Sequence, residues 1–434
     1  MVKNSGLLLG IMLAVIFSAC ASKPVSSGSV AIPSDIAGIV HAGNTNTPEE
    51  YALLDRLGVT WLLRTFNWHQ IEPSEGQWNF DTYDKYVDTA KAAGKKIVGI
   101  LAYDVPWIHE DGERRRYIPP DKIDYFLNYV RKTVSHFQGR VDVWCIWNEP
   151  NHHFWTGTRN EYLVLARYTA DAVREVDSDV LLLGGGFNRG IFGLPKAYIR
   201  GKFETGGMEK TDAIAFHPYE LNPARTLKLY RRFHKLVAEY GFEDRIWITE
   251  VGYPTGGRYP TRVKEKIFPE YVVKTFVNLA AEGAPVILWY QLFDPIERSN
   301  KNSENFFGLV RSREDYTSKG AEAFRLCAVH LAGTVYRPDL PRREKLPPSL
   351  KTFYFECKDN SGGTLVLWKN GSPKNVKISI KAGNSATAFA VHDPVSGSAV
   401  EIQTATGGVA GTVLKVGSMP VFVTWQGGGI PVLE

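Results

Sequence analysis

The sequence has little sulfur: its 434 residues include only four cysteines and four methionines. So few cysteines exclude a scaffold held together by disulfides. The sequence also contains no CxxC or HExxH pattern, which would indicate a metal site. Charge of one sign is also lacking, because 51 basic and 46 acidic residues leave a formal net charge of +5. That excess is too small to indicate a nucleic-acid-binding protein.

Long hydrophobic runs are lacking as well, except at the N-terminus. Leu7–Ala19 is too short to cross a bilayer but has the length of a signal-peptide core. It ends in Phe17-Ser18-Ala19-Cys20, which resembles a bacterial lipoprotein box, where the cysteine thiol receives lipid. We therefore expect a signal peptide over residues 1–19 and a lipidated N-terminus and linker over residues 20–34. The protein would be an exported lipoprotein of the periplasm, outer membrane or cell surface; cleavage a few residues later, giving a secreted protein, is the alternative.

Three cysteines remain after Cys20, and an odd number cannot all pair within one chain. Cys145 stands among tryptophan, valine and isoleucine residues, which predicts a buried thiol. A Cys327–Cys357 disulfide would suit an oxidising compartment, but the sequence does not establish it.

The middle of the chain alternates short β-rich runs with stretches of helical periodicity. Lys122–Gln138, for example, repeats apolar residues at helical spacing. The β-rich runs are Ile36–Val40, Val59–Arg64, Lys96–Leu101, Val141–Trp147, Val180–Leu183, Asp212–Phe216, Arg245–Thr249 and Pro285–Tyr290. This order predicts a (β/α)8 TIM barrel over residues 35–335. A Rossmann sheet is the alternative, but no GxGxxG follows an early strand.

The sequence pattern changes beyond residue 345. Short alternating runs separated by Gly, Asn, Ser and Pro predict an all-β, sandwich-like accessory domain over residues 345–434. Such a domain could bind carbohydrate, but structural support of the barrel is the commoner role.

The ends of the barrel strands carry the chemistry, because active sites of such barrels are built there. Two carboxylates, Glu149 and Glu250, fall at these ends. One protonated and one ionised carboxylate are what cleavage of a glycosidic bond requires. The other candidate site residues are Arg64, Asn148, His217, Tyr219, Trp289, His41, Trp68, Trp107, Trp155 and Tyr253. This chemistry needs no cofactor and no metal.

Two segments carry a family resemblance. Trp147-Asn148-Glu149-Pro150-Asn151, followed by Phe154-Trp155, resembles the acid/base segment of clan A glycoside hydrolases, especially family 39. Thr249-Glu250 resembles the nucleophile segment of that clan. The resemblance covers roughly residues 35–335. One departure, Trp144-Cys145 where family 39 usually has Phe-Glu, makes the clan a better fit than the family.

The resemblance implies a retaining hydrolase of β-linked glycans, with Glu149 as general acid/base and Glu250 as nucleophile. The resemblance also implies supporting roles. Asn148 would contact the sugar 2-hydroxyl, and Arg64 and Tyr219 would keep Glu250 ionised and oriented. His217 would support the site beside Glu149, and Trp289 would form the floor of the cleaved subsite. Trp68, Trp107, Trp155 and Tyr253 would be sugar platforms or rim packing, and His41 a site residue or an ordinary rim histidine.

The expected partner is an oligo- or polysaccharide, with no nucleic acid and with membrane contact only through the lipid on Cys20; the oligomeric state is open. Long loops near the mouth weakly favour endo-action. The alternatives are a non-catalytic surface glycan-binding lipoprotein, or a transglycosylase that uses the same residues.

A triple arginine lies in the loop Asp111–Arg116, on the side of the strand ends. It could meet an anionic glycan through charge-assisted hydrogen bonds. A solvated loop, partly neutralised by Asp111 and Glu113, is the favoured interpretation.

Overall fold

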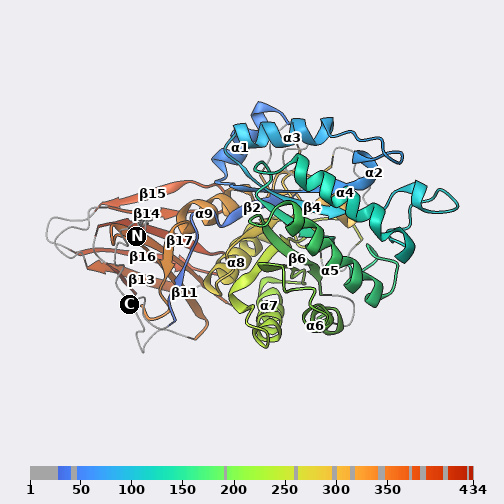
Figure 1. The fold of residues 1–434 in the computed structure, drawn as a ribbon. Helices are drawn as coiled ribbons and strands as arrows, with labels where there is room; N and C mark the ends of the chain where they lie inside the picture. The colour runs from blue at the N-terminus through green and yellow to red at the C-terminus, as the bar shows by residue number, and fades with distance from the viewer. Residues whose placement is uncertain are drawn as a thin grey trace, which may run out of the picture.

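The chain forms a closed barrel with a β-domain packed beside it (Figure 1). The computed structural model describes residues 28–40, 46–189, 193–258, 262–295, 301–312, 318–340, 348–370, 374–381, 388–403, 409–427 and 430–433. The expected signal peptide, Cys20 and His41 lie outside these residues. Within the described ranges, no helix is both long and apolar enough to cross a membrane.

The barrel consists of eight strands in chain order, each parallel to its neighbours. They are β2 (Ala37–Val40), β3 (Trp61–Asn67), β4 (Lys96–Ala102), β5 (Val143–Ile146), β6 (Leu181–Asn188), β7 (Ala213–His217), β8 (Ile246–Val251) and β9 (Ile287–Trp289). Ile39 of β2 pairs with Trp289 of β9, which closes the barrel. The eight expected strands and the (β/α)8 fold are therefore confirmed.

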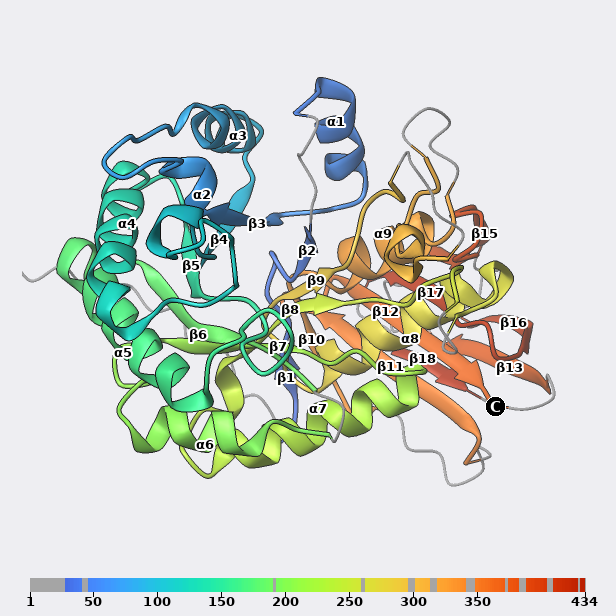
Figure 2. The ribbon, with the colours of Figure 1, turned by 90° about the vertical axis from the view of Figure 1, so that its right-hand side faces the viewer.

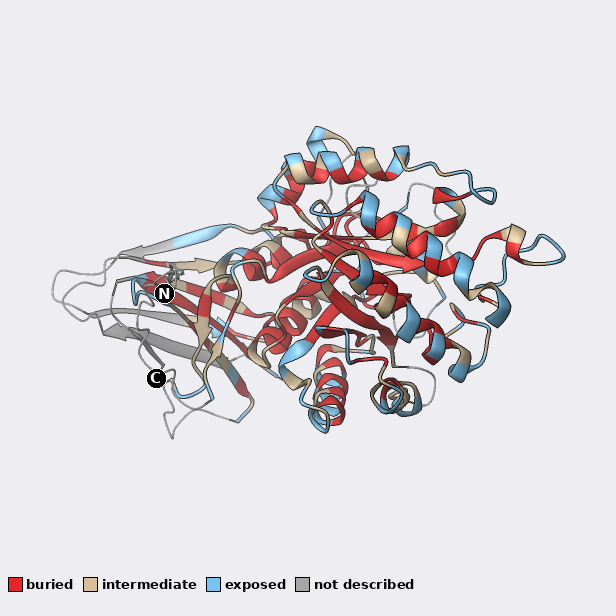
Figure 3. Cartoon of the chain, viewed as in Figure 1, coloured by how far each residue is buried: buried red, intermediate tan, exposed pale blue. Residues whose placement is uncertain are grey.

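Helices surround the barrel, and most of them are buried on the inner face and exposed on the outer face (Figures 2 and 3). They are α1 (Pro48–Arg56), α2 (Trp68–Ile71), α3 (Asp81–Ala92), α4 (Ile123–His136), α5 (Arg159–Val176), α6 (Lys196–Glu204), α7 (Pro223–Ala238), α8 (Phe268–Ala281) and α9 (Ala321–Leu331). Short 3-10 helices lie in the described connections: η1 (Pro106–Ile108), η2 (Pro120–Lys122), η3 (Glu243–Arg245), η4 (Glu265–Ile267) and η5 (Ser303–Phe306). The start of α5 is encoded locally, because Thr158 and Glu161 form a capping box.

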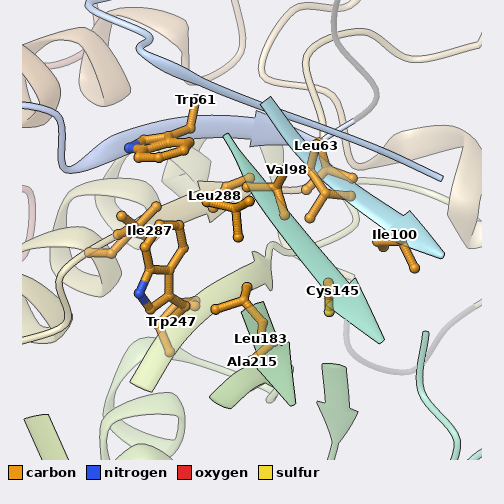
Figure 4. Packing of buried hydrophobic residues seen from close by; sticks show 14 of the residues in the cluster. Trp61, Leu63, Val98, Ile100, Cys145, Leu183, Ala215, Trp247, Ile287 and Leu288 are labelled. Carbon is orange, nitrogen blue, oxygen red and sulfur yellow. The ribbon is translucent and has the colours of Figure 1, made fainter. Parts of the chain in front are cut away.

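Apolar side chains fill the barrel interior (Figure 4). Trp61 and Trp247 meet edge-to-face there, with ring centroids 5.1 Å apart. Leu63 of β3 and Cys145 of β5 belong to the same buried cluster, so the expected burial of Cys145 is confirmed. Because side chains alternate along a strand, the residues before and after each inward-pointing residue point outward to the helices.

The β-domain has a seven-stranded sheet and a three-stranded sheet, in the orders β1-β10-β11-β12-β17-β14-β15 and β16-β13-β18. The strands are β1 (Val30–Ala31), β10 (Thr334–Tyr336), β11 (Leu350–Cys357), β12 (Gly362–Lys369), β13 (Lys374–Lys381), β14 (Ala388–His392), β15 (Ala399–Gln403), β16 (Val409–Val416), β17 (Val421–Gln426) and β18 (Ile430–Leu433). The expected C-terminal β-domain is confirmed, and its large sheet also takes in β1 and β10 from outside residues 345–434.

The large sheet is apolar on both faces. Phe355, Val366 and Trp368 join the core of the barrel on one face. On the other face, Leu365 and Leu367 pack in a second core that includes Val416 of β16. One face of the sheet thus belongs to the core of the barrel, while the other face covers a separate core within the domain. Cys327 and Cys357 are both free, so the disulfide that the sequence left open is not formed here.

Candidate active site

Two acids meet where the barrel strands end. Glu149 follows β5, the fourth barrel strand, and Glu250 lies in β8, the seventh. Both are largely buried, with side-chain exposures of 7% and 13%. One oxygen of each carboxylate and a ring nitrogen of His217 lie within 4.8 Å of one another. The strand ends therefore place two acids and one histidine in a single small site, as the sequence predicts.

The backbone around Glu149 leaves the strand geometry at once. Trp147 and Glu149 adopt positive φ angles of 62° and 43°, which non-glycine residues seldom do. The amide of Glu149 donates to the carbonyl of Gly186 at 2.8 Å, which fixes this turn against β6. A Cβ atom on Gly186 would lie 2.8 Å from Nε2 of His217, so only glycine allows this approach. The glycine run of β6 thus makes room for the site histidine.

Two donors hold the carboxylate of Glu149. Nδ1 of His217 lies 2.8 Å from Oε1 of Glu149, and Nδ2 of Asn188 donates to the same oxygen at 2.9 Å. Nε2 of His217 lies 3.0 Å from the hydroxyl of Thr249, the residue next to Glu250. A hydrogen-bonded chain thus runs from the fourth strand end to the seventh.

Glu250 has a different environment. Its Oε2 accepts a hydrogen bond from the hydroxyl of Tyr219 at 2.9 Å and lies 3.6 Å from Nδ1 of His217. The ring of Tyr219 packs edge-to-face on Tyr290 and Phe307, with centroids 6.3 and 6.0 Å away. This packing fixes the tyrosine hydroxyl, and the expected contact of Tyr219 with Glu250 is present.

The three groups shift one another's pKa values. Burial and then the charge of Glu149 raise the pKa of Glu250 to about 7, although His217 and Tyr219 oppose the shift. Burial alone would raise the pKa of Glu149, but the hydrogen bonds and charge of His217, together with Asn188, lower it. Burial likewise opposes the charge on His217, but the two glutamates outweigh it and raise its pKa. The buried pair consequently keeps one proton up to near-neutral pH.

The same three groups could also ligate a cation, since each offers one ligand atom within the 4.8 Å cluster. The contact of His217 with Glu149 favours a proton there instead. A metal ligand needs the lone pair of a neutral imidazole nitrogen, whereas the raised pKa of His217 favours an N–H at Nδ1.

The predicted role of Arg64 is corrected by the structure. Its guanidinium carbon lies 4.6 Å from the ring centroid of Tyr86 and 5.4 Å from that of Tyr83, both on α3. Leu63 points into the barrel, so the next residue along β3 must point outward. Arg64 therefore packs between barrel and helix and does not hold Glu250 ionised.

Trp289 does not form the floor of the site. Its side chain is fully buried and packs on Tyr253 and Phe268, between β9 and α8. The next residue, Tyr290, is half-buried and packs on Tyr219. The sequence places an aromatic pair at this strand end, but a shift of one residue exchanges the two faces of a strand.

The other aromatic candidates serve packing. Trp68, Trp155 and Tyr253 are buried, and their polar atoms bond to Glu72, to the carbonyl of Thr158, and to Thr226 and Thr275. Trp107 is half-buried, donates to the carbonyl of Glu72 and packs on Trp68 and Tyr125. The buried rings of Trp68, Trp155 and Tyr253 pack in the rim, whereas Trp107 keeps part of its ring exposed.

Asn148 is placed as expected, and it has a neighbour that the sequence did not single out. Its side chain is hydrogen-bonded with Tyr103 at the end of β4. Its Oδ1 is buried and accepts no hydrogen bond from the described residues. A buried carbonyl oxygen of this kind suits a substrate hydroxyl as donor.

Three further residues of the site are not among the candidate site residues that the sequence predicts. Asn188 binds Glu149, Tyr290 packs on Tyr219, and Glu304 of η5 lies 3.2 Å from the hydroxyl of Tyr290. Burial raises the pKa of Glu304, since its hydrogen bond from Tyr290 offsets only part of the effect. In the sequence, Asn188 is weakly indicated as the polar end of a glycine-rich strand. Nothing in the sequence indicates Glu304, because it follows no strand.

Comparisons with known proteins agree on the architecture. A family model described as β-galactosidase, glycoside hydrolase family 42, matches residues 41–102. A family 39 glycoside hydrolase from Bacteroides cellulosilyticus WH2 has a TM-score of 0.70 at 19% identity, over 91% of this chain and 81% of that chain. A family 39 β-xylosidase from Caulobacter crescentus has a TM-score of 0.66 at 14% identity, over 92% of this chain and 97% of that chain. A family 51 arabinofuranosidase from Xanthomonas axonopodis pv. citri has a TM-score of 0.59 at 11% identity, over 93% of this chain and 98% of that chain.

These structures share both the barrel and most of the β-domain, because more than nine-tenths of this chain is covered in each. The resemblance expected from the sequence is thereby confirmed at the level of the fold. The fold of the chain is therefore similar to that of clan A glycoside hydrolases, and family 39 enzymes are among the solved structures similar to it.

Proposed function

We propose that the protein hydrolyses β-linked glycans with retention of configuration, by double displacement. The observation that carries the proposal is the spacing of Glu149 and Glu250, whose nearest oxygens lie within 4.8 Å. Retaining glycosidases separate their carboxyl groups by about 5–5.5 Å, whereas inverting enzymes leave about 6.5–9.5 Å for a water molecule. The close pair leaves no room for that water between the second carboxylate and the sugar.

In the first step, the ionised carboxylate of Glu250 attacks the anomeric carbon while the glycosidic C–O bond breaks. The carboxylic acid of Glu149 gives its proton to the leaving oxygen, and a glycosyl ester on Glu250 results. In the second step, water attacks the anomeric carbon, Glu149 takes the proton from this water, and the ester bond to Glu250 breaks. Two inversions restore the β configuration.

The neighbouring residues support these steps. The single proton of the acid pair has to lie on Glu149 when Glu250 attacks, and the hydroxyl of Tyr219 stabilises the charge of Glu250 in that state. His217 and Asn188 then stabilise Glu149 after it has given up its proton. The buried Oδ1 of Asn148 can accept a hydrogen bond from the sugar 2-hydroxyl.

The test uses xylo-, gluco- and manno-oligosaccharides with β-1,4 links, aryl β-glycosides, and NMR of the first-formed anomer. We expect the β anomer, and loss of activity in Glu250→Ala and Glu149→Ala. Azide added to Glu250→Ala should give an α-glycosyl azide, and azide added to Glu149→Ala the β-glycosyl azide. Glu175→Ala removes an exposed acid on α5 and should leave activity unchanged.

Net inversion, or full activity in either site variant, would contradict the mechanism. Binding of oligosaccharides without hydrolysis by the wild type would favour the glycan-binding alternative. Products longer than the substrate would indicate transglycosylation through the same glycosyl ester.

We also propose that the protein is exported and anchored by lipid on Cys20, and that it acts on a polysaccharide outside the cytoplasm, internally along the chain. The lipoprotein-like segment supports the first part and the long loops around the strand ends the second. Cys20→Ser should move the protein from the membrane fraction to the soluble fraction. Product length over time on a soluble polysaccharide distinguishes internal cleavage, which gives mixed oligomers early, from release of single sugars.

A further inference from the structure

The loop between β4 and α4 is held in place by one buried acid. Asp104 is fully buried, and its carboxylate accepts the backbone amides of Arg115 and Arg116, the latter at 3.0 Å. His109 lies 2.9 Å from the same carboxylate. The tip of the loop is exposed (Figure 3), yet its return segment is anchored from below. The backbone of the triple-arginine segment thus has a defined position.

Arg116 is held in an unusual conformation. Its φ angle is +55°, in the left-handed region that favours glycine and asparagine, at a cost of about 1 kcal/mol or more. Its carbonyl accepts the amide of Thr156 at 3.2 Å, and the hydroxyl of Thr156 donates to the carbonyl of Arg115 at 2.6 Å. Asp104 and Thr156 therefore clamp this peptide from two sides and set the direction of the Arg116 side chain.

The three arginines differ in their partners. Arg115 pairs with Asp111, and Arg114 lies 3.9 Å from Asp104 and 3.2 Å from His69. Arg116 donates one hydrogen bond, to the carbonyl of His153 at 3.2 Å, and its guanidinium carbon lies 5.1 Å from the ring centroid of Phe154. Among the described residues, no carboxylate forms an ion pair with Arg116. Most of its five donors are available to a ligand.

Arg116 is connected to the site through two aromatic rings. Phe154 stacks on Tyr103 with a centroid distance of 6.1 Å, and Tyr103 is hydrogen-bonded with Asn148. The charge of Arg116 reaches Tyr103, where it opposes the rise in pKa that burial causes. Tyr103, Phe154 and Arg116 thus lead from Asn148 to the exposed loop, on the side of the acid/base Glu149.

We propose that Arg116, with Phe154, forms a subsite for an acidic sugar unit, which binds its carboxylate next to the cleaved bond on the acid/base side. This inference rests on the proposed function. A guanidinium matches the geometry of a carboxylate with two parallel hydrogen bonds, and an aromatic face packs on the apolar face of a sugar ring. Burial and the charges of His152 and Arg116 lower the pKa of the neighbouring His153. Of Arg116 and His153, Arg116 is therefore the side chain that stays positively charged.

The test measures binding to the catalytically inactive Glu250→Ala protein by calorimetry. Two probes are compared: a linear β-1,4-xylo-oligosaccharide and the same oligosaccharide carrying one glucuronic acid. We expect the acidic probe to bind more tightly than the neutral probe. Arg116→Asn should weaken binding of the acidic probe by roughly tenfold or more, because a charge-assisted hydrogen bond contributes about 1.5–3 kcal/mol. The neutral probe should change less than about threefold.

Asparagine tolerates the left-handed backbone, so Arg116→Asn keeps the loop conformation. Arg115→Asn, in the same loop but paired with Asp111, is the matched control and should leave both affinities unchanged. Equal affinity of the wild type for both probes, or equal losses in the two variants, would overturn the proposal. Because binding is measured without turnover, a failure of the proposed hydrolysis would show separately, as absent hydrolysis in the wild type.

Discussion

The hydroxyl of Tyr219 offers a direct measure of how the site stabilises its nucleophile. Tyr219→Phe removes only the hydrogen bond to Glu250, which is 2.9 Å long, and keeps the packing of the ring on Tyr290 and Phe307. A hydrogen bond to a charged group contributes about 1.5–3 kcal/mol. At 1.36 kcal/mol for each factor of ten, kcat/KM should fall roughly 10- to 150-fold.

The loss should also change the pH profile. Without its donor, the pKa of Glu250 rises further above the usual range of a glutamate, because burial and Glu149 already raise it. Less Glu250 is then ionised at neutral pH. The free energy of unfolding should change by about 1 kcal/mol or less, since ring volume and contacts are kept.

The assay compares kcat/KM for dinitrophenyl and alkyl β-glycosides, with thermal unfolding measured alongside. Tyr253→Phe is the matched control: Tyr253 is also a buried tyrosine, but its hydroxyl bonds to Thr226 and Thr275 between barrel and helices. It should lose stability and retain activity within about twofold. If Tyr219→Phe kept its kcat/KM with both leaving groups, or if Tyr253→Phe lost as much, the reasoning would be refuted.

Three other outcomes are expected. As pH rises through about 7, kcat/KM should fall, because the acid pair loses its last proton near the raised pKa of Glu250; a flat profile to pH 9 would contradict this. Asn188→Ala should lower kcat/KM roughly 10- to 100-fold by removing a donor from Glu149, and unchanged kinetics would exclude that role. Trp68→Ala should destabilise the fold by about 3–5 kcal/mol in urea unfolding, while the folded fraction keeps its KM; a large rise in KM with normal stability would instead support a sugar platform.

The fold could be predicted from the sequence because barrel strands are buried on both sides and appear as short apolar runs. The same periodicity located Glu149 and Glu250, since each directly ends or follows such a run. His217 and Tyr219 could be found for the same reason. Strand order and strand ends are local properties of the chain.

The direction of individual side chains could not be predicted in the same way. Arg64 lies in the middle of β3, which runs beyond the predicted Val59–Arg64, and Trp289 ends β9. Both point outward, because the inward position is decided by neighbours such as Leu63 and by the closure of β9 on β2. Trp68, Trp155 and Tyr253 follow strands but fold back into the rim. Glu304 reaches the site from a connection far from any strand end, and such a contact depends on tertiary structure alone.

The short strand β1 has a consequence for where the protein would lie relative to a membrane. Val30–Ala31 pairs with β10 in the large sheet and leads directly into the start of β2, at the end of the barrel opposite the acids. If Cys20 carries lipid, the nine residues before Val30 span at most about 30–35 Å. The start of β2 would then lie close to the membrane, and the acids at the opposite ends of the barrel strands would lie farther from it.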